Sequence, residues 1–123
     1  RGLADVTMYD VTDEVQTESE PVSAEACASV DVNRTGEQTI DTVALVTGDR
    51  VLLIGQTDAA ENGLFVVDAG AWTRTADTLA TGLSVIVADG TDNAPAIYRL
   101  STEGTITPDV TDLDWDRLTP EAP

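Results

Sequence analysis

Histidine and lysine are absent from this 123-residue chain, which has a single cysteine and only two Trp, two Tyr and one Phe. Without histidine there is no His-based catalytic triad, and one cysteine forms neither an internal disulfide nor a zinc cage. No apolar run approaches the roughly 20 residues that cross a bilayer, and no basic-then-apolar signal opens the chain. The composition predicts a protein without catalytic residues, cofactors or membrane insertion, with an aliphatic core.

Acidic side chains dominate the charge, because 23 Asp and Glu residues stand against 6 Arg and give a net charge of −17. Such a surface repels phosphate, so nucleic acid is excluded as a partner. Repulsion of this size destabilises a small domain in dilute buffer, but at molar salt the Debye length falls to about 3 Å. An acidic surface without lysine is typical of adaptation to saturating salt. The alternative is an acidic protein of an ordinary cell.

Short apolar runs separated by glycine or proline recur along most of the chain, at 49–54, 64–67, 71–75, 83–87, 96–100 and 113–118. This spacing predicts an all-β fold, a small antiparallel β-sandwich or barrel. The only helical signal is one turn at 58–63, which Asp58 would cap and Gly63 would end. The hydrophobic fraction of 41% is sufficient for the core of one domain.

The first part of the chain differs in composition from the rest. Residues 13–26 are acidic, contain a proline and lack aromatics, which favours an extended linker, although residues 3–12 alternate enough for a short strand. We therefore divide the chain into an acidic N-terminal arm, residues 1–26, and a β-rich domain, residues 27–123.

Three aspartates near the C-terminus form the most site-like pattern. On a strand, alternate residues share a face, so the carboxylates of Asp112, Asp114 and Asp116 would lie together as oxygen ligands for calcium or sodium. The alternative is the solvent face of an edge strand, with Leu113 and Trp115 turned inward. A flat strand supplies too few ligands for a closed calcium site, so we favour the second interpretation.

Weaker patterns occur elsewhere in the chain. Residues 89–93 (Asp-Gly-Thr-Asp-Asn) resemble a calcium loop in ligand type but fit a hairpin turn better. Asn33-Arg34-Thr35 is a glycosylation sequon, which has meaning only if the chain passes a glycosylation machinery. Cys27 is expected to be a small buried hydrophobe rather than a reactive thiol.

The segment from Gln38 to Arg74 carries a resemblance. Its specific parts are Gly48-Asp49-Arg50-Val51-Leu52 and Glu61-Asn62-Gly63. These blocks resemble a domain of tailed-virus tail fibres and related virion surface proteins, and the resemblance covers roughly residues 28–118. It implies a virion component without catalytic residues in this domain.

The physical chemistry of these blocks also indicates structural roles for their residues. Gly48 and Asp49 would form a tight turn before a central strand, and residues 58–63 would be a capped connection. Arg50 and Arg74 would pair with acids such as Asp58 or Glu61, each exposed pair contributing about 0–1 kcal/mol, and Trp72 would pack in the core. The chain departs from the family at Ile54-Gly55, where a Lys-Asp pair is usual, and at the three late aspartates.

Together, composition and resemblance predict a structural protein on the surface of a tailed virus that infects a halophilic archaeon. It would be a tail fibre, an appendage, or a capsid turret or decoration that contributes to host attachment. Its partners would be other virion proteins, copies of itself and a host glycan or S-layer, and the arm would dock onto a neighbouring subunit. The alternative is a secreted or cell-surface carbohydrate-binding β-domain of such an archaeon.

Overall fold

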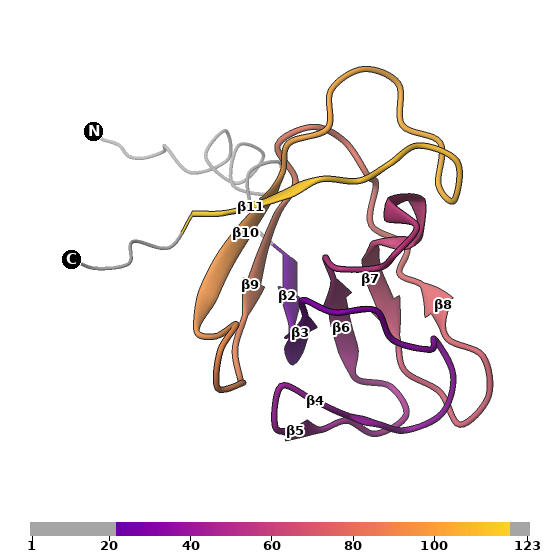
Figure 1. The fold of residues 1–123 in the computed structure, drawn as a ribbon, viewed down its shortest axis with the longest axis vertical. Coiled ribbons are helices and arrows are strands. Elements are labelled where there is room, and N and C mark those ends of the chain that lie inside the picture. The colour runs from indigo at the N-terminus through magenta and orange to yellow at the C-terminus, as the bar shows by residue number, and fades with distance from the viewer. Residues whose placement is uncertain (1–21, 119–123) are drawn as a thin grey trace, which may run out of the picture.

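A computed structural model describes residues 22–118, which form two packed β-sheets, a small hairpin and one turn of 3-10 helix (Figure 1). Most of the acidic arm that the sequence predicts, including the expected strand at 3–12, lies outside the described residues. Within the described part there is no helix long and apolar enough to cross a membrane.

The first sheet has the strand order β11-β10-β9-β2. Strands β9 (Ser84–Val87) and β10 (Ala96–Leu100) form an antiparallel hairpin, and β11 (Trp115–Arg117) pairs with the other side of β10. Strand β2 (Val22–Ala24) pairs with β9 in parallel. Buried and exposed residues alternate along β9 and β10, as expected for a sheet with one face on the core and one in solvent.

The second sheet has the strand order β3-β6-β7-β8. Its strands are β3 (Ala26–Ala28), β6 (Arg50–Leu53), β7 (Gly63–Val66) and β8 (Thr73–Arg74). Strand β6 pairs with β3 in parallel and with β7 antiparallel, so it is an inner strand. It follows the turn at Gly48 and Asp49, as the sequence predicts for the central strand.

Both faces of this second sheet are covered. One face packs on the first sheet through a cluster that includes Leu52, Leu64 and Val85. The other face packs on residues from the hairpin of β4 (Thr39–Ile40) and β5 (Val43–Ala44) and its flanks, with Trp72 in the same cluster. A strand buried on both faces has a continuous apolar sequence instead of an alternating one, which explains the run Val-Leu-Leu in β6.

Glu25 joins the two sheets at one corner. Its backbone N–H donates to Arg50 O at 2.8 Å, in the second sheet, while its carbonyl accepts from Asp89 N at 3.0 Å, beyond the end of β9 in the first sheet. Its side chain accepts from Arg50 N at 2.7 Å. Strands β2 and β3 therefore act as one bent strand that changes sheet, which is a common way to form a corner in packed β structures.

The all-β prediction is confirmed, with three refinements. The sheets pack in a sandwich-like arrangement that is not a closed barrel. Two strand pairs, β2 with β9 and β3 with β6, are parallel, so the arrangement is not purely antiparallel as predicted. Residues 22–26, which the predicted division assigns to the arm, form β2 and the corner at Glu25 within the folded sheets.

Candidate functional site

The connection from β6 to β7 contains the most specific block of the sequence, and the structure makes it a single 3-10 turn, η1 (Ala59–Glu61). The Asp58 carboxylate accepts from the backbone N–H of Ala60 at 3.1 Å, which confirms the predicted cap. The turn ends at Asn62, and Gly63 enters β7 with φ of +132°. A Cβ on Gly63 would lie 2.6 Å from a guanidinium nitrogen of Arg74 and would displace that guanidinium, and the positive φ is itself one that residues with a side chain rarely adopt.

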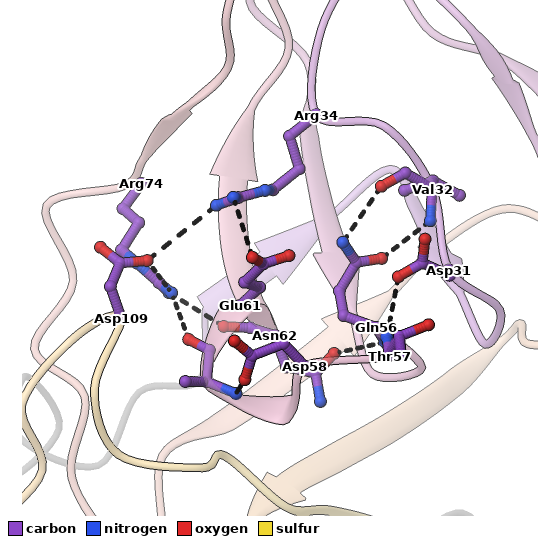
Figure 2. Close-up of polar contacts among 11 residues, drawn as sticks. Asp31, Val32, Arg34, Gln56, Thr57, Asp58, Glu61, Asn62, Arg74 and Asp109 are labelled. Atoms are coloured by element: carbon purple, nitrogen blue, oxygen red, sulfur yellow. Dashed lines mark hydrogen bonds and ion pairs between the residues drawn. The ribbon is translucent and has the colours of Figure 1, made fainter.

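Two buried amides hold this turn against its neighbours (Figure 2). Asn62 is 3% exposed. Its side-chain amide accepts a hydrogen bond from Gln56 N at 2.8 Å and donates one to Leu113 O at 3.1 Å. The Gln56 amide in turn makes a two-way contact with the backbone of Val32, at 2.9 and 3.0 Å. One amide therefore connects the turn to the segment before β11, and the other to the segment after β3.

Arg74 fixes the same turn from β8, by binding the backbone carbonyls of the turn and not its acidic side chains. Its guanidinium donates to Asn62 O and Ala60 O, both at 2.9 Å, and to Asp109 at 2.9 Å (Figure 2). It also lies over the Phe65 ring, 4.7 Å from the centroid. The prediction that Arg74 pairs with Asp58 or Glu61 is therefore wrong, although its expected role in fixing this connection is confirmed.

Arg34 is the basic partner of Glu61, with 3.7 Å between the charged groups, and it lies 4.0 Å from Asp109. Asp109 thus faces two arginines, and the hydrogen bond from Arg74 lowers the pKa of its carboxyl below the ordinary value, with a smaller opposing effect of desolvation. The sequence predicts that Arg50 also pairs with an acid of this turn, and that prediction is wrong. Arg50 pairs with Asp77 at 2.6 Å instead.

The remaining structural predictions around the second sheet are confirmed. Gly48 has φ of +100°, and the Asp49 carboxylate accepts from Val46 N at 2.9 Å, which closes the tight turn before β6. Trp72 is 6% exposed, and its indole N–H donates to Gly36 O at 2.8 Å. Its burial therefore includes a satisfied polar atom.

The loop at 89–93 joins β9 to β10, which agrees with the turn interpretation. The carboxylate of Asp41, from the β4–β5 hairpin, accepts from the backbone N–H groups of Asp92 and Asn93, the latter at 2.8 Å. Desolvation raises the pKa of Asp41, but these backbone hydrogen bonds outweigh it and lower the pKa below the ordinary value. A carboxylate from another hairpin thus binds the amides of this loop, and Gly90 leaves room for it.

The three late aspartates lie along one exposed edge. Strand β11 begins only at Trp115, so Asp112 and Asp114 precede it, and all three carboxylates are exposed while Leu113 is buried. Within residues 22–118, no group of three His, Cys, Asp or Glu side chains is placed to hold a metal ion, and these aspartates are not brought together as one.

Cys27 lies in the core, at 0% exposure, as predicted. Burial raises the pKa of its thiol to about 12, so the group stays protonated at neutral pH and is a poor nucleophile. Asn33, in the sequon, is exposed.

Four residues that hold these loops were not singled out by the sequence: Arg34, Gln56 and Asp109 around the β6–β7 turn, and Asp41 at the β9–β10 loop. Asp109 and Asp41 adopt positive φ, at +68° and +50°, which no local sequence signal announced. A search for similar proteins found no matching family model, no matching curated protein and no matching solved structure.

Proposed function

We propose that this chain is a non-enzymatic structural protein on the surface of a virus particle, from a tailed virus of a halophilic archaeon. The starting point is the resemblance of Gly48–Leu52 and Glu61–Gly63 to virion surface domains. The observation that carries the proposal is the use of those residues: Asn62 and Arg74 connect the turn to the segment before β11 and to β8, and Gly63 lies against Arg74. Loops anchored in this way suit a domain that is displayed on a particle.

The charge distribution supports the environment that we propose. Asp112, Asp114 and Asp116 are exposed. The arginines Arg34, Arg50 and Arg74 are each within ion-pair distance of a carboxylate. Unpaired surface charge is thus largely negative, and it repels itself unless salt screens it. A particle surface in saturating brine supplies that screening.

Repetition in a particle supports the expected partners, which are other virion proteins and copies of this chain. A domain of this size contributes to a capsid or tail by symmetric repetition. A tail fibre, an appendage and a capsid decoration all satisfy this requirement.

The test is proteomic. Virus particles from a haloarchaeal culture are banded on a salt gradient and digested with trypsin, which cuts this lysine-free chain only after arginine. We expect peptides ending at Arg50, Arg74 and Arg117 to band with the major capsid protein. Their presence in cell-surface fractions and absence from the particle band would overturn the proposal and favour the carbohydrate-binding alternative, which a glycan array at high salt would then examine.

A further inference from the structure

A pocket of about 320 Å³ opens between the segment that follows β8 and the loop from β10 to β11. Aliphatic side chains from both segments and from β7 line it: Leu64, Leu79, Ile106 and Pro108. Polar side chains complete the lining: Arg74, Thr75, Asp77 and Thr78. This volume is at the low end of ligand pockets, roughly 300–1,000 Å³. A chain segment that inserts a few aliphatic side chains fits such a lining better than a ring that needs an aromatic platform.

The charges around this pocket are compensated, unlike those of the protein as a whole. Arg74 pairs with Asp109 at 2.9 Å, and Arg50 pairs with Asp77 at 2.6 Å. Arg34 pairs with Glu61 nearby, at 3.7 Å. In a chain of net charge −17, an acidic segment meets less repulsion here than over an unpaired carboxylate surface.

The chain enters the folded domain beside this pocket. Arg50 links the two places, because its guanidinium donates to Ser23 O at 3.0 Å with Nε and to Asp77, on the pocket lining, with a terminal nitrogen at 2.6 Å. Ser23 lies in β2, the first strand described. The first described strand therefore lies one side chain away from the pocket.

We propose that this pocket binds the N-terminal segment of the same chain, residues 3–11. That segment combines acids with the aliphatic side chains of Leu3, Val6, Met8 and Val11. Met8 lies 14 residues before Val22, a span of at most about 50 Å when extended, so the connection reaches the pocket easily. A flexible Met side chain suits an irregular aliphatic pocket, and tethering keeps its local concentration in the millimolar range.

This inference concerns the folded domain and does not depend on the virion proposal. It differs from the expectation that the arm docks onto a neighbouring subunit. In that case the same segment would enter the pocket of a second copy.

Disulfide trapping in the full chain separates these cases. Met8→Cys is combined with Thr78→Cys, at an exposed position on the pocket rim, or with Ile106→Cys, on the aliphatic wall. The matched control combines Met8→Cys with Val46→Cys, which is 53% exposed and follows β5 at the opposite end of the molecule from the β10–β11 loop (Figure 1). Cys27 does not compete, because it is fully buried.

Each variant is oxidised at low protein concentration in about 3 M NaCl, where the Debye length is below about 3 Å, and followed by non-reducing electrophoresis and mass spectrometry. We expect intramolecular disulfides with position 78 or 106 to form about tenfold faster than with position 46, because docking raises the local concentration. Equal rates at all three positions would overturn the proposal. Disulfide-linked dimers as the main product at the pocket positions would also overturn it and would assign the segment to a second copy. Thr78→Cys keeps the test valid if Ile106→Cys disturbs the wall.

Discussion

The buried side-chain amide of Asn62 connects the β6–β7 turn to Gln56 and Leu113, and replacing Asn62 with alanine tests whether these contacts hold the turn. Asn62→Ala leaves the N–H of Gln56 and the carbonyl of Leu113 without their partners at 2.8 and 3.1 Å. A buried polar group left unsatisfied costs about 1–3 kcal/mol. We therefore expect a loss of about 2–6 kcal/mol in the free energy of unfolding, a large part of the stability of a small domain.

Urea denaturation at pH 7 and a fixed, high NaCl concentration measures this loss, since guanidinium would itself screen the surface charges. Asn33→Ala is the matched control, because it removes the same amide from an exposed position and should stay within about 0.5 kcal/mol of the wild type. Asn62→Asp keeps the acceptor for Gln56 but places a buried carboxylate oxygen against the carbonyl of Leu113, so it should also destabilise the domain. If Asn62→Ala unfolds like Asn33→Ala, the network does not hold the turn and our reasoning is refuted.

Three further outcomes follow from the same structure. Trp72→Ala should lower the free energy of unfolding by about 3–5 kcal/mol, as large core truncations do, and a melting temperature equal to that of the wild type would contradict its buried position. Asp109→Asn should lower the free energy of unfolding at pH 7, as measured by urea titration. Because the pKa of Asp109 is lowered in the folded state, the difference in stability between variant and wild type should shrink as the pH falls below about 4. A stability difference that persists in acid would exclude the ionised carboxylate as its cause. Replacing Asp112, Asp114 and Asp116 together with threonine should relieve repulsion and so raise the melting temperature more in about 0.2 M NaCl than in about 3 M NaCl. If a chelator lowers the melting temperature of the wild type but not of this variant, the three aspartates are a metal site.

Local patterns predicted most of the strands. Runs bounded by glycine or proline at 49–54, 64–67, 83–87 and 96–100 correspond closely to β6, β7, β9 and β10. The capped turn at 58–63 was also predictable, since Asp58 and Gly63 mark its two ends by local chemistry. Such signals act over a few residues, and tertiary contacts did not override them here.

The missed elements depend on contacts between distant parts of the chain. Strands β2 and β3 are three residues each, and the acidic composition of residues 13–26, which include β2, favoured a linker. They are strands because they pair with β9 and β6, some 60 and 25 residues away, and because Glu25 satisfies both sheets at the corner. A local sequence pattern does not indicate which distant strand will pair with a short strand in parallel.

The partners of the arginines were unpredictable for a similar reason. Arg74 could be assigned to the turn at 58–63, but its contact with the carbonyls of Ala60 and Asn62 depends on how β8 pairs with β7. Asp109 lies in the long loop between β10 and β11 and adopts φ of +68°, and the sequence does not show that this conformation turns its carboxylate toward Arg74. An acidic chain offers each arginine many possible partners, so sequence alone does not select one.

Surface display on the particle is the central claim, and immunoelectron microscopy of intact particles tests it most directly. Antibodies are raised against the folded protein at high salt, and gold-labelled antibodies are applied to intact particles and to particles opened by low salt. We predict regular labelling of the outer surface of intact particles, at the tail or on the capsid. Labelling confined to opened particles, or labelling of the host cell envelope with bare particles beside it, would contradict the proposal.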